Sequence, residues 1–172
     1  PMGPKKFSKA LKKFQEDPLY QEEMLKHTDT YLDYISGIVH SFDTRPYVAV
    51  EKRLDYSHIV PEGFGTGDCI IISGNTLNVI DFKYGKGVPV PAYENPQMKL
   101  YALGALAAYS ILYNIEIVKM TIVQPRTEQV TDEYEMPVEA LYEWAEEIKP
   151  IAQRAFKGEG DFVPGEIQCR FC

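Results

Sequence analysis

The chain has 172 residues, a formal net charge of −7, and 45% hydrophobic and 12% aromatic residues. This length suits one domain, and the apolar content argues against intrinsic disorder and supports one sizeable core. No stretch resembles a signal peptide or a transmembrane helix, and three cysteines do not make a disulfide framework, so we expect a cytoplasmic protein with no membrane partner. The acidic total argues against a large, uniformly basic nucleic-acid surface but not against a local one.

Charge is uneven along the chain. Residues 1–13 hold five lysines and no acid, whereas residues 127–147 hold eight acids and no basic residue. Two solvated helices of opposite charge would explain this distribution. The alternative is that the lysine cluster touches a polyanion. The opening Pro1-Met2-Gly3 is not a natural start, so we expect the sequence to be a segment of a longer chain.

Hydrophobic periodicity and turn residues predict the elements in chain order. We expect helices over residues 6–16, 18–42, 94–113 and 138–156. We expect strands over residues 47–56, 68–72, 77–83 and 115–124. A loop with two glycines and two prolines over residues 84–91 joins the third strand to the third helix. The order predicts an α/β sandwich, in which a four-stranded mixed β-sheet is flanked by α-helices.

The register of the central hairpin brings two acidic residues together. If Gly74-Asn75 is a two-residue turn, Ile72 pairs with Leu77, and the same register sets Asp68 opposite Asp81. Directly opposed carboxylates repel unless a cation or a shared proton lies between them. Side chains alternate along a strand, so Asp81 and Lys83 share a face. Hard oxygen ligands at this spacing suit Mg²⁺ or Mn²⁺, although turn or capping roles are the structural alternative for each aspartate.

Three short segments resemble successive motifs of one enzyme superfamily. Gly65-Thr66-Gly67-Asp68, Asp81-Phe82-Lys83 and Gln97-Met98-Lys99-Leu100-Tyr101 are similar to motifs of the PD-(D/E)XK nucleases, in the branch with a Gln-x-x-x-Tyr signature that contains RecB-like, AddB-like and CRISPR-associated exonucleases. The resemblance covers about residues 46–124. It implies a restriction-endonuclease-like core.

The resemblance also implies roles for individual residues. Asp68, Asp81 and the backbone carbonyl of Phe82 would hold the divalent metal. Lys83 would orient the attacking water or stabilise the transition state. Gln97 and Tyr101, which share a helix face, would help to place the DNA strand. Without the resemblance, these last two would read as ordinary helix residues.

Together these features predict a Mg²⁺- or Mn²⁺-dependent DNA nuclease, with exonuclease action expected, that uses metal-activated water. The predicted organisation is a single domain over residues 1–172. It comprises a helical part over 1–45, a catalytic core over 46–124, and a C-terminal helix and tail over 125–172. A helicase or recombination protein would be a suitable partner. Two alternatives stay open: a catalytically inactive DNA- or protein-binding module, and a metal-dependent phosphatase.

Two further charged residues are candidates for the site. Glu51 lies in an apolar strand, where an unpaired charge is costly, so it would either approach the metal or pair with Lys52 or Arg53. Lys86, in the loop after the third strand, would meet a phosphate or be solvated.

The resemblance is incomplete at both ends of the chain. The branch carries a helical Gly-x-x-His-x-x-x-Glu pattern, and Gly37 and His40 match it, but Thr44 stands in place of Glu. Cys169 and Cys172 resemble the beginning of the iron–sulfur ligand set of RecB-like relatives. Such a cluster needs about four ligands, and only Cys69 remains, so we expect no cluster within this chain.

Overall fold

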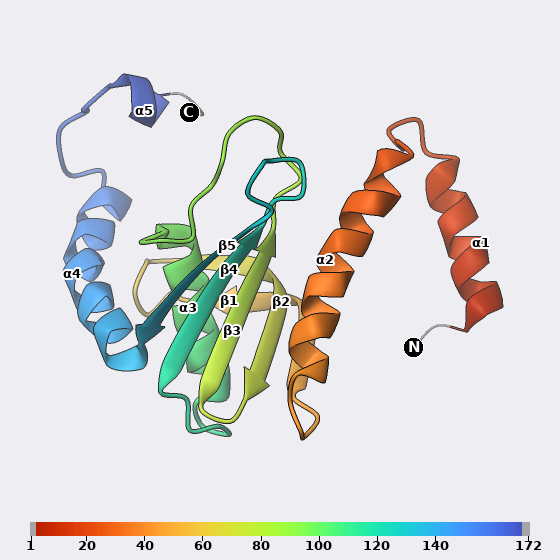
Figure 1. Cartoon of the computed structure of the whole chain (residues 1–172). Helices are drawn as coiled ribbons and strands as arrows, with labels where there is room; N and C mark the ends of the chain where they lie inside the picture. Colours follow the sequence, from red (N-terminus) through yellow and green to blue (C-terminus); the bar gives the residue numbers. More distant parts are fainter. Residues whose placement is uncertain (1–2, 170–172) are drawn as a thin grey trace.

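The computed structural model describes residues 3–169 and consists of one mixed β-sheet with helices packed against both of its faces (Figure 1). The helices are α1 (Pro4–Gln15), α2 (Glu23–His40), α3 (Pro96–Tyr109), α4 (Val138–Phe156) and α5 (Glu166–Cys169). The strands are β1 (Tyr47–Asp55), β2 (Phe64–Ser73), β3 (Thr76–Phe82), β4 (Ile117–Val123) and β5 (Thr131–Pro137). Among these residues, no helix is both long and apolar enough to cross a membrane.

The sheet has five strands in the order β1-β2-β3-β4-β5, so the α/β class is confirmed but the expected count of four strands is wrong. Only β3 and β4 are parallel, and α3 forms the crossover between them. The missed strand, β5, pairs antiparallel with β4 at the edge of the sheet. Its sequence is rich in acids, which suits an edge strand but resembles a solvated run when the sequence is considered alone.

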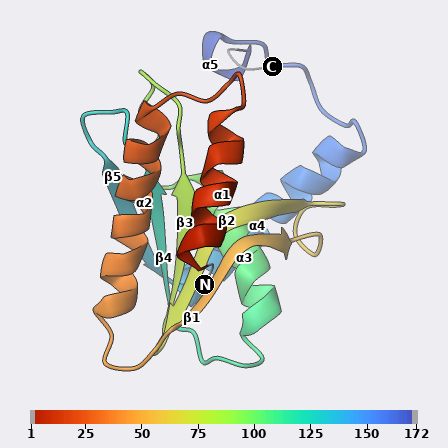
Figure 2. The same cartoon turned by 90° about the vertical axis from the view of Figure 1, so that its right-hand side faces the viewer.

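The two faces of the sheet are covered by different helices (Figure 2). On one face, Tyr31, Ile35 and Ile38 of α2 pack against a small buried cluster, which comprises Cys69, Ile71, Ile80 and Val123. On the other face, α3 and α4 cover a larger core that includes Ile70, Leu77 and Val79. Alternation from Cys69 to Ile72 therefore sends Cys69 and Ile71 toward α2, and Ile70 and Ile72 toward α3.

The turn between β2 and β3 fixes the register. Ile72 pairs with Leu77 and Ser73 with Thr76, as predicted from a two-residue turn. Gly74 has a φ of 56°, the left-handed region that the first central residue of a type II′ turn requires. Strand β2 begins at Phe64, four residues earlier than expected. The prediction placed its start too late because the glycines between residues 63 and 67 are typical of a break between elements.

Helix α3 is shorter than expected at both ends. It begins at Pro96, where the Asn95 side chain accepts hydrogen bonds from the backbone N–H groups of Gln97 (3.0 Å) and Met98 (3.2 Å). Such caps satisfy backbone donors that lack a partner within the helix. The cap therefore fixes the backbone position from which the side chain of Gln97, the first functional candidate of this helix, extends.

Close packing of α3 on β1 gives the first testable prediction. A Cβ atom at Gly104 would lie 2.9 Å from Leu54 Cβ and 3.3 Å from the Asp55 carbonyl oxygen. We expect Gly104→Ala to lower the free energy of unfolding by about 1–3 kcal/mol in urea denaturation, since α3 would have to move away from the strand. The matched control is Gly37→Ala in α2, where a Cβ meets nothing within 4 Å. That change should stabilise the protein by about 0.5–1 kcal/mol, and equal effects at both glycines would contradict the packing argument.

Candidate active site

The candidate site lies where β2 and β3 separate. Their ladder ends with the pair Cys69 and Ile80, one step before Asp68 and Asp81 would face each other. Beyond that pair, the backbone N–H of Phe82 donates to Asp68 Oδ2 at 2.7 Å. A side-chain carboxylate thus takes the place of a backbone acceptor. The predicted register is confirmed up to this point, and Asp68 is held by the backbone of β3 next to Asp81.

Asp81 is the most buried charged group of the site. Its residue is 4% exposed, and its Oδ2 atom lies 2.9 Å from Lys83 Nζ. Apart from this ion pair, Oδ2 has no polar partner among the described residues. Burial raises the pKa of Asp81, the neighbouring Lys83 ammonium opposes the rise, and the Asp68 carboxylate adds to it.

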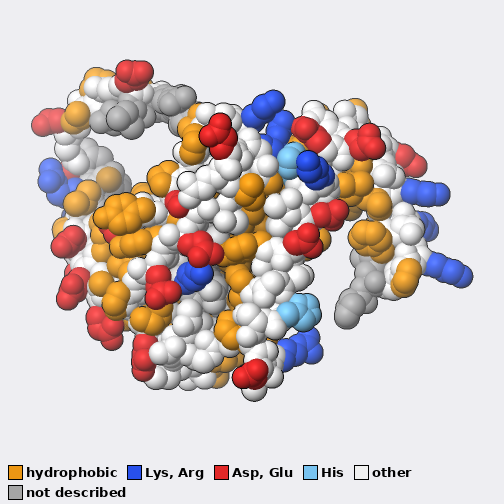
Figure 3. Space-filling model, in the orientation of Figure 1, with side chains coloured by type: hydrophobic (Ala, Val, Ile, Leu, Met, Phe, Trp, Pro, Cys, Tyr) orange, Lys and Arg blue, Asp and Glu red, His pale blue; other side chains and the backbone are white. Residues whose placement is uncertain are grey.

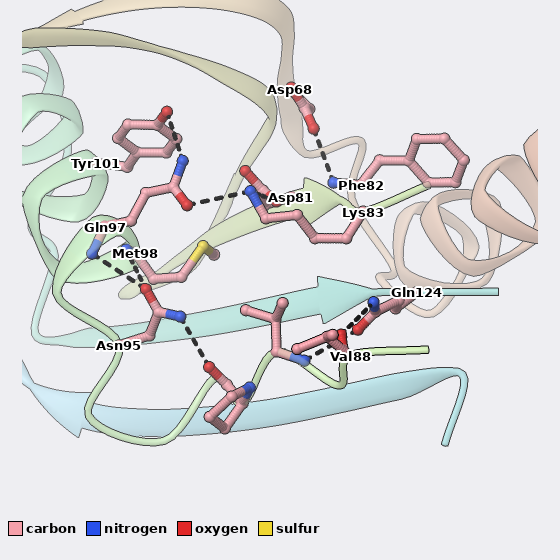
Figure 4. A network of polar contacts seen from close by, with 12 residues as sticks. Asp68, Asp81, Phe82, Lys83, Val88, Asn95, Gln97, Met98, Tyr101 and Gln124 are labelled. Carbon is pink, nitrogen blue, oxygen red and sulfur yellow. Dashed lines mark hydrogen bonds and ion pairs between the residues drawn. The ribbon is translucent and has the colours of Figure 1, made fainter. Parts of the chain in front are cut away.

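A chain of polar contacts ties Lys83 to α3 (Figure 4). Lys83 Nζ donates to Gln97 Oε1 at 3.1 Å, and Gln97 Nε2 donates to the Tyr101 hydroxyl at 2.9 Å. The ring of Tyr101 lies against β2, because Gly65 has no side chain there: a Cβ would come within 2.4 Å of Tyr101 Cε1. The structure therefore brings Asp81, Lys83, Gln97 and Tyr101 together on the α3 side of the sheet.

Tyr31 of α2 is a site neighbour that the sequence analysis missed. Its ring packs on Phe82 with centroids 5.0 Å apart, and its buried hydroxyl has no hydrogen-bond partner among residues 3–169. Burial raises the pKa of Tyr31, and the nearby Cys69 and the carboxylates of Asp68, Asp81 and Glu51 raise it further. No sequence signal marks this tyrosine, since it belongs to an ordinary apolar helix face.

Glu51 occupies an unusual backbone position in β1. The pairs on either side of it, Val50 with Cys69 and Lys52 with Gly67, set it opposite Asp68. Its φ of 51° is left-handed, a conformation that costs about 1–2 kcal/mol in a residue other than glycine. The residue is exposed, contrary to the buried strand we expected, and within the described chain it forms no ion pair with Lys52 or Arg53.

The loop from β3 to α3 is held by Gln124. This side chain, in a residue only 4% exposed, accepts from Val90 N (3.0 Å) and donates to the carbonyl oxygens of Val88 (2.9 Å) and Gly85 (3.3 Å). Figure 4 shows Gln124 and Val88 below the Asp81–Lys83 cluster. Lys86 lies exposed in the same loop, and the described structure gives it no ion-pair partner. The loop is thus anchored while its lysine faces solvent.

The metal-ligand chemistry of the site is sparse. Within residues 3–169, no group of three or more His, Cys, Asp or Glu side chains converges as a metal site. The available hard donors are the carboxylates of Asp68 and Asp81 and the backbone carbonyl of Phe82. Cys69 is buried in the core and Cys169 is exposed, while Cys172 lies outside the described residues. Burial raises the pKa of the Cys69 thiol to about 11, which suits a structural cysteine.

The raised pKa of Asp81 predicts a pH-dependent stability. The folded protein keeps its proton to higher pH than the unfolded chain, so the free energy of unfolding falls as pH rises from about 4 through the folded pKa. Asp81→Asn removes the free-energy cost of ionising a buried carboxyl group. Without divalent ions, we expect the variant to be more stable than the wild type by about 1 kcal/mol at pH 7. This advantage should disappear below about pH 4 in thermal unfolding. A constant difference at all pH values would contradict it.

Anchoring by Gln124 predicts a localised effect on the loop. Gln124→Leu removes the side-chain partner of three backbone groups, at Gly85, Val88 and Val90, so we expect a loss of about 2 kcal/mol in stability. We also expect faster hydrogen exchange at the Val90 amide. The control is Gln153→Leu on the exposed surface of α4, which should change neither quantity. Unchanged exchange at Val90 in the Gln124 variant would show that the loop is held by other interactions.

The fold and site define an α/β protein with a five-stranded mixed sheet and an acid–lysine cluster at the point where two central strands separate. The chain belongs to the family described as "Protein of unknown function (DUF2800)", which matches it over residues 1–172. It is also similar to the crystal structure of SSO0001, with 17% sequence identity, coverage of 96% of this chain and 75% of that one, and a TM-score of 0.37. A likeness this weak carries no argument about fold or function.

Proposed function

We propose that this chain is a metal-dependent DNA nuclease domain of the PD-(D/E)XK type, with exonuclease action expected. The observation that carries the proposal is the buried Asp81 carboxylate, whose Oδ2 atom has the Lys83 ammonium, 2.9 Å away, as its one polar partner among the described residues. A buried charge is costly unless it is paired or binds a metal, and Lys83 offsets only part of that cost. A catalytic or metal-binding role would explain why a charged side chain is present at this buried position.

The donor set fits Mg²⁺ or Mn²⁺. Asp81 Oδ2 and the Asp68 carboxylate are hard oxygen ligands, and the Phe82 carbonyl lies in the backbone between Asp81 and Lys83. When bound, a divalent ion would lower the pKa of a coordinated water and neutralise charge on a phosphate. Few protein ligands are needed, because Mg²⁺ commonly keeps several waters.

The chain's own residues then supply orientation and charge. The Phe82 N–H fixes the Asp68 carboxylate at 2.7 Å, so this ligand is held before any metal arrives. Gln97 holds the Lys83 ammonium on the same face as Asp81, where it can orient water or stabilise charge that develops on a phosphate. Tyr101 restrains Gln97 in turn. Because the ammonium is already oriented, little free energy is needed to reorganise it during the reaction.

Activity measurements on three variants test the proposal. With Mg²⁺ or Mn²⁺ and linear or circular DNA, we expect Asp81→Ala and Lys83→Ala to lower cleavage at least about 100-fold. The matched control is Lys119→Ala, which removes a strand lysine that is ion-paired with Glu133 at 2.7 Å. That variant should cut as the wild type does. Equal activity in all four proteins would remove the site assignment, and preference for linear DNA would support exonuclease action.

A second candidate is a DNA- or protein-binding module on the same fold. It is favoured by the absence of a third acidic ligand at the cluster within residues 3–169. Mn²⁺ titration by calorimetry separates the two candidates: binding that Asp81→Ala abolishes supports the nuclease, and no binding at all supports the module. Hydrolysis of a chromogenic phosphate monoester without cleavage of DNA would instead indicate a phosphatase.

A further inference from the structure

Helix α1 separates its charged and apolar residues completely. At about 100° per residue, its five lysines fall within an arc of about 120°, opposite the stripe formed by Phe7, Leu11 and Phe14. The apolar stripe faces α2 across a groove of about 430 Å³, whose other wall includes Met24, Leu25 and Leu32. All five lysines are exposed, and within the described chain none forms an ion pair.

The clustering of lysines does not stabilise helix α1 by itself. Lys5, Lys9 and Lys13 stand four residues apart in succession, and like charges at that spacing destabilise a helix by about 0.2–0.5 kcal/mol per pair. Lys5 and Lys6 lie in the first turn, which contains no acid, and there the helix dipole disfavours cations. An external polyanion would relieve both forms of repulsion.

The rest of the molecule has the opposite charge. Removing the five lysines of α1 from the net charge of −7 leaves −12 on the remaining residues. In Figure 3 the lysines of α1 project at the right-hand edge, while acidic side chains gather over α4 at the left. Any polyanion that approaches this chain is therefore repelled by most of the surface and attracted at α1.

We infer that the lysine face of α1, formed by Lys5, Lys6, Lys9, Lys12 and Lys13, binds the phosphate backbone of DNA. DNA is favoured over a membrane because the apolar stripe, which a membrane would have to bury, lines the groove toward α2, where Phe7 and Phe14 remain 57% and 68% exposed, whereas the five lysines lie on the opposite side of the helix. From Lys5 to Lys13 the helix rises about 12 Å, a length of duplex that carries about seven negative charges. The inference rests on the proposed function, which supplies DNA as the polyanion.

The test measures DNA binding without divalent ions, so that it does not depend on cleavage. Fluorescence anisotropy of a 30-base-pair duplex is recorded at several salt concentrations for the wild type and for a variant with all five lysines changed to Gln, which has a similar helix propensity. We expect weaker binding by at least about tenfold near 0.1 M salt. The slope of log K against log salt should fall by about 0.9 for each phosphate that the variant no longer neutralises.

Two control variants make the result specific. One replaces the same five lysines by Arg, which keeps the charge and should keep the wild-type slope. The other has the same net charge as the Gln variant, with the changes elsewhere, at Lys26, Lys119, Lys149, Arg154 and Lys157. An unchanged slope in the α1 Gln variant, or an equal weakening in this second control, would overturn the inference.

The remaining outcomes also decide the question. If the Arg variant loses DNA binding as the Gln variant does, charge on α1 is not what binds, and the inference fails. If the Gln changes weaken binding to phosphatidylserine vesicles but not to DNA, α1 is a membrane-binding helix, and the inference fails. Cleavage assays on Asp81→Ala test the proposed function separately, so DNA binding through α1 by a chain that does not cut would sink only the enzyme proposal.

Discussion

The separation of β2 from β3 is the constraint on which the site depends. Had the ladder continued beyond Cys69 and Ile80, the Phe82 N–H would have bonded to β2 backbone, and the aspartates would have faced each other as an unrelieved pair. Instead the Asp68 carboxylate accepts that N–H at 2.7 Å while β3 continues to pair with β4 through Phe82 and Val123. One side chain therefore takes the place of the β2 backbone at the point where the pairing of β2 with β3 ends.

The two faces of β3 contact different helices at this point. Phe82 directs its ring toward α2, where it packs against Tyr31, and this aromatic contact closes that side of the sheet. Asp81 and Lys83 point the other way, toward Gln97 and Tyr101 of α3. Alternation along the strand sets Asp81 on the same face as the buried Val79, and its β4 partner Ile122 is also buried in that core, which gives the carboxyl group a low-dielectric setting. The same alternation explains why burial, rather than a like-charged neighbour, is the largest cause of its raised pKa.

Local sequence rules predicted the parts of this structure that depend on near neighbours. The Gly74-Asn75 turn fixed the register of β2 and β3, and alternation set Lys83 beside Asp81. The rules failed where contacts are distant. Tyr31 reaches the cluster from a helix more than fifty positions before Phe82 in the printed sequence, and no local pattern carries that information. Strand β5 was missed because its acids suit an edge strand that exists only once β4 is present to pair with it.

Electrostatics links the site to the amino-terminal helix. Asp68 and Asp81 outnumber Lys83, so the cluster would present net negative charge to the DNA backbone, which is itself negatively charged. A strand of DNA can approach such a site only if cations compensate, either a divalent ion between the carboxylates or lysines elsewhere on the protein. Helix α1 is the segment that concentrates positive charge on this acidic chain. Attraction at α1 is independent of base sequence, because phosphate contacts hold the backbone and read no bases. A nuclease built in this way would hold DNA through its backbone and leave the chemistry to the acid–lysine cluster.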